Sequence, residues 1–271
     1  LEASITRYEH YFALQLGLQA GKKVLDLGCG VGGPMRSIAR LSGAQVTGIN
    51  NNGYQVERGN RYNREHGLDG LCEVVKGDFM RLPFDDASFD AAYDFEALVH
   101  APDLAGVAKE IARVLKPGGR FVASDWCITE HYREDDRTHR RVKLQIEEGN
   151  GLPDIPTAST WHNAFIEAGF RINSHQDLAQ SGSPSTPWYL PLTHHEWSVR
   201  ALRAHPVGRW ATSALVRALE ASKMAPSGAS EVSEMLDVAG RALVEGGELG
   251  IFTPLFFMCA EKVTASRRAQ S

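Results

Sequence analysis

Hydrophobic residues in the first half of the chain follow two alternating patterns. Short runs rich in β-branched residues are typical of buried strands, and they are separated by segments with an apolar residue every three or four positions, which is typical of helices. The runs predict five strands, at 22–28, 44–50, 71–78, 89–94 and 119–126. Helices are expected from Pro34 and from Leu104, the second ending before Pro117. This alternation predicts consecutive βαβ units and a parallel sheet.

The second half of the chain is less regular. The charged stretch 129–143 predicts a solvated helix and a connector, 160–170 a capped helix leading into a strand near Arg171, and 251–260 the last strand. About seventy residues precede that last strand, far more than an ordinary connection, which indicates a substrate lobe. Its helices are expected at 197–203, 207–221 and 230–244. We therefore predict a core at 1–178, a helical insertion at 179–249, and a last core strand with a tail at 250–271.

Composition narrows the class of ligand. The 271 residues are 43% hydrophobic, enough for one large core with an appended lobe. A net charge of −4 offers no basic stripe for phosphates, so nucleic-acid binding is disfavoured and a small-molecule ligand is expected. The longest apolar run, 250–260, is about half of the ~20 residues that a membrane-spanning helix needs.

The cysteines indicate a reducing compartment. They are far apart and form no CxxC pair, so we expect buried thiols rather than a disulfide framework or a zinc site: Cys29, Cys72, Cys127 and Cys259. No metal site is expected. No signal peptide is visible, but the sequence begins at Leu1 without a Met, which leaves its natural N-terminus and its targeting open. We expect a cytoplasmic protein, with at most peripheral membrane contact and with a homo-oligomer left open.

A glycine-rich turn follows the first predicted strand. The segment 26–34 matches GxGxxG through Gly28, Gly30 and Gly33, a tight turn whose bare backbone can approach a ligand before a helix N-terminus. This motif alone fits NAD as well as other nucleotides. Asp26, two residues before the first glycine, would repel a pyrophosphate and attract the ammonium and sulfonium groups of S-adenosylmethionine. A cationic cofactor therefore fits better.

Two further strand ends complete the predicted cofactor site. After the second strand, where a dinucleotide-binding chain usually carries an acid, Asn50 and Asn51 can bond both ribose hydroxyls, although Asn-Asn-Gly is also good turn chemistry. After the third strand, Asp78 can accept from the adenine amino group while Phe79 lies against the ring. The ends of parallel strands are where such crevices form.

Longer motifs carry a family resemblance. The segments VLDLGCGVGGPMRSIARL, INNNGYQVERG, VVKGDFMRLPF, FEALVHAPDLAGVAKEIARVLKPGGRFV and IFTPLFF resemble the S-adenosylmethionine-dependent sterol 24-C-methyltransferases, over about 8–261. The resemblance implies an α/β, Rossmann-like class I methyltransferase: a seven-stranded, mostly parallel sheet with helices on both faces and a helical insertion before the last strand. It also implies methyl transfer from S-adenosylmethionine to the side-chain double bond of a sterol, through a carbocation that loses a proton to a base.

The resemblance also assigns roles to residues. Glu96 holds the cation or the methionine end of the cofactor, and His100 takes the proton, with a helix-start acid and a hydrogen-bonded core histidine as the alternative. Asp125 and Glu147 match family acids and are further catalytic candidates, with salt-bridged scaffolding as the alternative. Further candidates are Tyr11 and Gln55 at the cofactor, and Tyr8, Trp188 and Tyr189 at the substrate, with plain packing or loop anchoring as the alternative for the aromatic residues.

Departures from the family pattern leave the acceptor open. The family often shows EATCHAP and YEW where this chain has EALVHAP and SDW. Family members also carry an aromatic segment upstream of the matched region. Two alternatives remain beside sterol methylation. One is a methyltransferase for another terpenoid or small metabolite, and the other is a non-catalytic sterol-binding protein.

Overall fold

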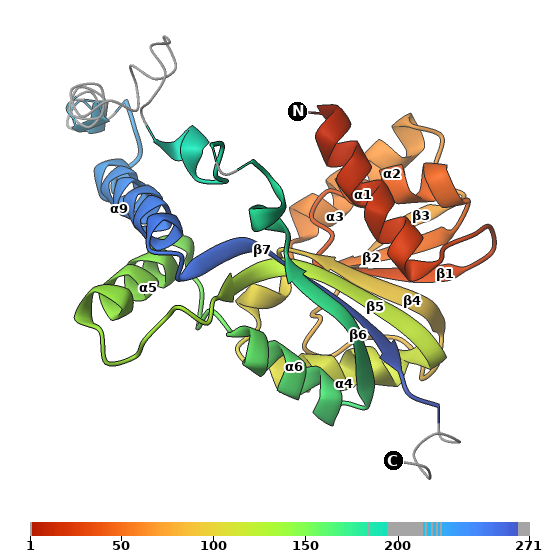
Figure 1. Cartoon of the computed structure of the whole chain (residues 1–271). Coiled ribbons are helices and arrows are strands. Elements are labelled where there is room, and N and C mark those ends of the chain that lie inside the picture. The colour runs from red at the N-terminus through yellow and green to blue at the C-terminus, as the bar shows by residue number, and fades with distance from the viewer. Residues whose placement is uncertain are drawn as a thin grey trace. The chain divides into compact units, whose positions relative to one another are not determined.

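A computed structural model describes residues 2–183, 185–193, 214, 216–217, 219–220, 222 and 224–264. Its centre is one mixed, mostly parallel sheet of seven strands in the order β3-β2-β1-β4-β5-β7-β6 (Figure 1). The strands are β1 (Lys23–Leu27), β2 (Gln45–Asn50), β3 (Cys72–Lys76), β4 (Phe89–Phe95), β5 (Leu115–Ile128), β6 (Phe170–Asp177) and β7 (Phe252–Lys262). The strand order reverses between β1 and β4, which are parallel neighbours. Ligands of open α/β sheets bind at such a switch point, beyond the carboxyl ends of the strands.

Helices cover both faces of this sheet, as the sequence predicts. Figure 1 shows α4 (Leu104–Val114) and α6 (Ala158–Glu167) on one face, packed on each other. The other face carries α1 (Glu2–Leu16), α2 (Gly33–Ser42) and α3 (Gly53–Glu65). The apolar residues of α4 that recur every three or four positions are buried, so this periodicity determines which face of the helix lies on the sheet: Leu104, Val107, Ala108, Ile111 and Val114.

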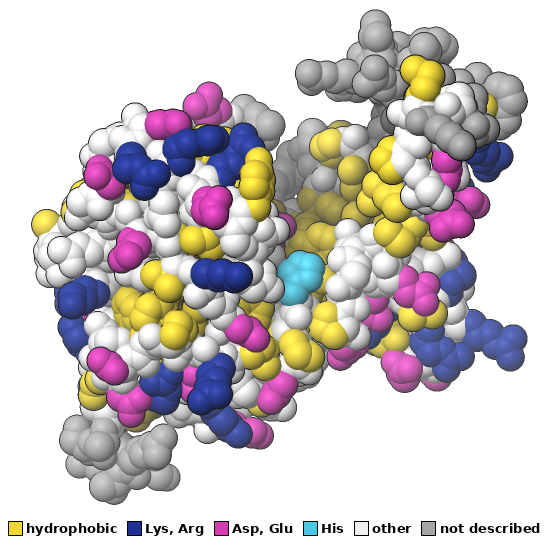
Figure 2. Space-filling model, turned by 180° about the vertical axis from the view of Figure 1, so that it is seen from behind, with side chains coloured by type: hydrophobic (Ala, Val, Ile, Leu, Met, Phe, Trp, Pro, Cys, Tyr) yellow, Lys and Arg dark blue, Asp and Glu magenta, His cyan; other side chains and the backbone are white. Residues whose placement is uncertain are grey.

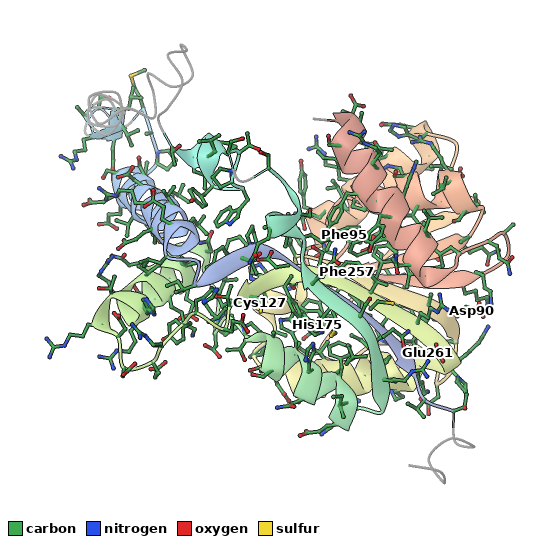
Figure 3. All side chains as sticks on the ribbon, viewed as in Figure 1. Asp90, Phe95, Cys127, His175, Phe257 and Glu261 are labelled. Carbon is green, nitrogen blue, oxygen red and sulfur yellow. The ribbon has the colours of Figure 1, made fainter. Side chains whose placement is uncertain are left out.

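An aromatic cluster fixes α1 on the sheet. Phe12 is fully buried, stacks on Phe95 at 3.9 Å between ring centroids, and meets the edge of Phe257 at 5.7 Å. Phe95 belongs to β4 and Phe257 to β7, and both are labelled in Figure 3. Burial of one such side chain stabilises the fold by about 1.5–3 kcal/mol. The first helix is therefore an integral part of the fold at the end of β4.

The chain divides into two compact units. Unit 1 contains Leu1–Trp126, Ala158–Gln176 and Leu255–Ser271, and unit 2 contains Cys127–Thr157 and Asp177–Pro254. Within unit 2, α5 (Arg137–Asn150) packs on α9 (Ala229–Glu248), and short 3₁₀ helices, η2 and η3, lie at Leu178–Ser181 and Leu190–Leu192. A Cβ at Gly149 would overlap Ala239, so the two helices approach through small residues. The three-segment division expected from the sequence stays a prediction.

Most predicted elements are confirmed, with shifts at their ends. The helix in the charged stretch starts only at Arg137, because Asp136 caps it by accepting from the N–H groups of Thr138 and His139. The helix expected at 230–244 is α9. The helix expected at 197–203, and most of the one at 207–221, lie outside the described residues.

The charges on the surface and the state of the cysteines match what the composition of the chain predicts. Basic and acidic side chains are interspersed on the face seen in Figure 2. All four cysteines are buried and none of them forms a disulfide, which confirms the expected thiols. No described helix is both long and apolar enough to cross a bilayer.

Candidate active site

The glycine turn after β1 is where three loops of unit 1 converge. Gly28 has φ +65°, and a Cβ there would overlap the Ala97 side chain and lie 4.0 Å from the Phe79 ring. The loops that follow β1, β3 and β4 therefore meet at a position that only glycine can occupy. At Gly30, with φ +56°, a Cβ would meet no atom within 4 Å, so the backbone there is open. The α2 N-terminus begins at Gly33 and has no side-chain cap.

Asp26 lies in β1 next to this turn and is only 2% exposed. It accepts a hydrogen bond from the Tyr93 hydroxyl at 2.8 Å. Burial raises the pKa of Asp26 to about 7, and the Tyr93 bond only partly offsets this. The carboxyl is thus poised to ionise when a cation approaches. Its direct contact with a cofactor stays a prediction.

The three successive amides after β2 have different roles. Asn50 donates to the Gly30 carbonyl at 3.2 Å and to Gln55 Oε1 at 2.7 Å, so it braces the glycine turn against α3. Asn52 caps α3 by accepting from the N–H groups of Tyr54 and Gln55. Asn51 is exposed. The ribose contacts expected of Asn50 and Asn51 stay predictions, and of these two side chains Asn51 is the exposed one.

Asp78 and Phe79 follow β3 as the sequence indicates. Asp78 is exposed, and its Oδ1 accepts from the Met80 N–H at 2.8 Å, which shapes the turn. The Phe79 ring reaches the glycine turn, as its distance from Gly28 shows. An exposed carboxylate and an aromatic face beside an open backbone are a suitable arrangement for an adenine ring.

Glu96, directly after β4, has an uncommon backbone conformation. Its φ is +55°, one of two positive values among the described residues other than glycine, which costs about 1–3 kcal/mol. Its N–H donates to the Ser124 carbonyl at 2.9 Å, and its carboxylate bonds to the Trp126 side chain. Solvent reaches Glu96, yet the protein around it raises the pKa of its carboxyl. Strain held by tertiary contacts is typical of functional positions.

Two tyrosines of α1 border this turn. Tyr8 donates to Ser124 Oγ and meets the Phe95 ring edge to face at 5.9 Å. Burial, together with the nearby Glu96 charge, raises the pKa of Tyr8 to about 12. Tyr11 lies against Phe257, with ring centroids 5.2 Å apart. The structure thus brings Tyr8 close to Glu96, while the ligand contacts of both tyrosines stay predictions.

The two remaining candidates of this region differ in exposure. His100 ends the 3₁₀ helix η1 (Leu98–His100), four residues after Glu96, and is exposed. Asp125 is fully buried, and its two oxygens accept from the N–H groups of Val99 and Trp126 at 2.8 and 2.7 Å. The Asp125 side chain is thus closed off from solvent. Its catalytic role stays a prediction, and the geometry favours a supporting role beneath the turn.

The candidates of unit 2 are held differently. Glu147 is half-buried, pairs with Lys143 at 2.5 Å and accepts from the Ile155 N–H at 2.8 Å, which matches its alternative reading as scaffolding. Trp188 meets Tyr189 and Phe252 edge to face, with ring centroids 5.5 and 5.6 Å apart. Contacts of these residues with a substrate stay predictions.

Sequence reasoning missed Asp94 and Trp126. Asp94 is an acid in the fully buried part of β4, and it lies against Asp125. Its position within the strand is a usable signal, because an acid in a buried run needs a partner. Trp126 was recognised only as part of a strand, and its bond to Glu96 depends on tertiary structure. Within the described ranges, no three His, Cys, Asp or Glu side chains form a group that could hold a metal ion.

Comparisons with known proteins agree with this geometry. The model of the methyltransferase domain family matches residues 25–123, and that of the sterol methyltransferase C-terminal family matches 199–262. The chain is 51% identical to cycloartenol-C-24-methyltransferase 1 of Oryza sativa subsp. japonica, over 97% of this chain and 76% of that protein. It is 49% identical to the cycloartenol-C-24-methyltransferase of Arabidopsis thaliana, over 97% and 77%. Identity to the sterol 24-C-methyltransferase of Eremothecium gossypii is 44%, over 96% and 71%.

Solved structures show the same fold at low identity. A sarcosine dimethylglycine methyltransferase described as putative, from Galdieria sulphuraria, superposes with a TM-score of 0.70 at 22% identity, over 96% of this chain and 86% of that one. The geranyl diphosphate C-methyltransferase of Streptomyces coelicolor A3(2), in complex with S-adenosyl-L-homocysteine, superposes with a TM-score of 0.68 at 20% identity, over 95% and 78%. The predicted class I methyltransferase fold is confirmed.

Proposed function

Because this chain belongs to the sterol 24-C-methyltransferase family, we propose that it methylates carbon 24 in the side-chain double bond of a sterol. The observation that carries the proposal is 51% identity over 97% of the chain to an enzyme named for this reaction. The chain is an S-adenosylmethionine-dependent methyltransferase. What remains to be tested is the acceptor and the role of each residue.

The residues of unit 1 fit that cofactor. The open backbone at Gly30 and the uncapped N-terminus of α2 offer free N–H groups, and Asp26 offers a carboxyl able to ionise near a cation. Asp78 presents an exposed carboxylate and Phe79 an aromatic face. When bound, the cofactor supplies an electrophilic methyl group on a sulfonium. A negative and aromatic environment suits that charge better than it suits a pyrophosphate.

The surroundings of Glu96 suit the charge that develops on the sterol. The alkene carbon bonds to the methyl group, the carbon–sulfur electron pair stays with sulfur, and a tertiary cation remains on the side chain. The Glu96 carboxylate and the rings of Tyr8 and Phe95 stabilise it, each exposed or partly exposed ring by roughly 0.5–2 kcal/mol. A hydride shift moves the cation, and loss of a proton to His100 restores the double bond. Glu96 is thus the charge stabiliser and His100 the base.

The test is incubation with methyl-deuterated S-adenosylmethionine and a panel of sterols with unsaturated side chains, followed by mass spectrometry. We expect label at carbon 24 of at least one sterol, and loss of one deuterium wherever the proton leaves from the new carbon. Including prenyl diphosphates and small amines in the panel tests the alternative acceptors. Labelling of those compounds alone, with cofactor binding intact, would overturn the sterol assignment.

We also propose weak peripheral contact between the protein and the membrane that supplies the sterol. Val232, Met235 and Leu236 of α9 are 52, 45 and 58% exposed, which supports an apolar docking patch. Sedimentation with sterol-containing vesicles should retain the protein. Replacing Val232 and Leu236 by Ser should reduce that retention without changing cofactor affinity, and equal retention of both proteins would contradict the patch.

A further inference from the structure

Two buried acids face each other beneath the Glu96 turn. Strands β4 and β5 are parallel, with Asp94 opposite Ala123. Side chains alternate along a strand, so Asp125, two residues beyond Ala123, projects from the same face as Asp94. Both acids are fully buried, and their carboxyl groups lie close enough to share a hydrogen bond. Such a bond requires a proton on one of them.

The other hydrogen bonds locate this proton. Both Asp125 oxygens accept backbone N–H groups, from Val99 and Trp126. Asp94 Oδ1 likewise accepts from Ala97 at 3.0 Å and Leu98 at 3.2 Å. Asp94 Oδ2 is the one oxygen of the pair that accepts no N–H, and it is buried without any other partner. A proton on Asp94 Oδ2, donated to Asp125, satisfies every atom of the pair.

We propose that Asp94 is a neutral acid, that Asp125 is its carboxylate partner, and that together they are positioning residues for Glu96. Burial and the neighbouring carboxyl raise the pKa of Asp94 well above its usual value, in agreement with this assignment. The ionisable side chains nearest to the pair include Tyr8 of α1 and Glu96 itself. Because Asp94 is neutral, the pair carries one negative charge rather than two.

The pair positions Glu96 in two ways, through the backbone that follows it and through Trp126 of β5. Asp94 and Asp125 together hold the N–H groups of the three residues that follow it, 97–99. Asp125 also holds the N–H of Trp126, whose side chain bonds to the Glu96 carboxylate. The pair thus connects the turn to the group that orients Glu96, and it offsets the cost of the positive φ. Without it, several buried N–H groups would lack acceptors, at about 1–3 kcal/mol each.

This assignment makes the two acids unequal under amide substitution. In Asp94→Asn, Oδ1 still accepts and the amide N–H replaces the acid O–H, so we expect kcat within about threefold of wild type. In Asp125→Asn, an amide N–H would face a backbone N–H, so we expect kcat to fall at least about thirtyfold. Affinity for S-adenosyl-L-homocysteine should change little in both variants. Asp94→Ala should lose activity as well, which makes Asp94→Asn the conservative rescue.

Asp90 provides a matched control on the same strand. It lies at the opposite end of β4 from Phe95 (Figure 3), accepts from the Lys23 N–H at 2.9 Å and bonds to Lys116 at 2.8 Å. Asp90→Asn removes an acid that is also hydrogen-bonded, and we expect kcat to be unchanged. A loss equal to that of Asp125→Asn would mean that any damage to the sheet lowers turnover, and it would overturn the positioning role.

Infrared spectroscopy tests the proton without a substrate. At about pH 9, where Asp26 with its pKa of about 7 is ionised, the carbonyl band of a buried protonated acid should be present in the wild type and absent in Asp94→Asn. Persistence of that band in Asp94→Asn, or equal loss of activity in Asp94→Asn and Asp94→Ala, would overturn the proposal. The positioning role rests on the proposed function, whereas this band does not. A failed sterol assay with an intact band would therefore contradict only the function.

Discussion

The polar residues expected at the cofactor in unit 1 and the aromatic residues expected at the substrate in unit 2 are held by different physical means. In unit 1 the polar side chains are fixed by directional bonds: Asp26 to Tyr93, Asn50 to Gly30, and Asp125 to the turn that carries Glu96. In unit 2 the aromatic side chains are fixed by contact with small residues. A Cβ at Gly247 of α9 would overlap Tyr189 and lie 2.9 Å from Trp188.

This difference matches the chemistry of the two expected ligands. Hydrogen bonds and buried acids give geometric precision around a charged, polar cofactor. Apolar packing gives shape without direction, which suits a sterol. Substitutions in unit 1 should therefore change cofactor affinity or kcat, whereas those in unit 2 should change KM for the acceptor.

The largest effect is expected from Glu96→Gln. Glutamine keeps an oxygen for the Trp126 bond but lacks the charge, so kcat should fall by about 10²–10⁴-fold. Affinity for S-adenosyl-L-homocysteine, measured by calorimetry, should stay within about threefold. Glu73→Gln, on an exposed position of β3, is the control. Unchanged turnover in Glu96→Gln would remove this residue from the mechanism.

A smaller effect is expected from Asp78→Ala. Loss of a charge-assisted hydrogen bond to adenine should raise the Kd of the cofactor by about 10–100-fold. Asp78→Asn keeps the oxygen that caps the Met80 N–H and separates loss of charge from loss of the turn. The exposed Asp69, in the loop before β3, serves as the control. Equal Kd values for Asp78→Ala and Asp69→Ala would refute the adenine contact.

Gly247→Ala tests unit 2. The new methyl group must displace Tyr189, and we expect KM for the sterol to rise by about 3–10-fold with little change in cofactor Kd, because overpacking typically costs ~1–3 kcal/mol. Gly240→Ala, on the same helix but with no atom within 4 Å of the new Cβ, is the matched control. If both variants behave alike, the aromatic pair does not shape the acceptor site.

The last prediction is a pH dependence of cofactor affinity that comes from Asp26. Its raised pKa of about 7 leaves it largely protonated below that pH, and a bound cation favours the ionised form. Affinity for S-adenosylmethionine should therefore fall as pH drops below about 7, by up to about tenfold per pH unit, with proton release on binding. In the free protein, the stability of the fold changes with pH in the opposite direction, because the folded state retains on Asp26 a proton that the unfolded state loses. The free energy of unfolding should thus fall as pH rises from about 4 to about 7.

Calorimetry in two buffers of different ionisation enthalpy measures that proton release. Asp26→Asn should abolish it and flatten the pH dependence of the affinity. Identical proton release in the wild type and in Asp26→Asn would show that Asp26 does not ionise with the cofactor.

Several features of the site could be read from local sequence. The glycine turn, the acid before it and the polar residues after β2 and β3 are separated by regular strand and helix lengths, so chain order predicted that they gather at one edge of the sheet. Roles were harder to assign. Asn50 and Asn52 are both good turn residues, yet one braces Gly30 and the other caps α3. Which of the two asparagines braces and which one caps depends on where the glycine turn after β1 lies in the folded protein.

The sequence by itself determined the βαβ order, the glycine turn and the family, because hydrophobic periodicity and short motifs depend on near neighbours. Tertiary structure alone decided that Asp94 and Asp125 meet, that Asp26 is buried against Tyr93, and that Trp126 reaches Glu96. These contacts join different strands, and each carboxyl takes its protonation from the burial and the partners found there. A residue type fixes which bonds are possible, whereas the packed fold fixes which are made and which proton is kept.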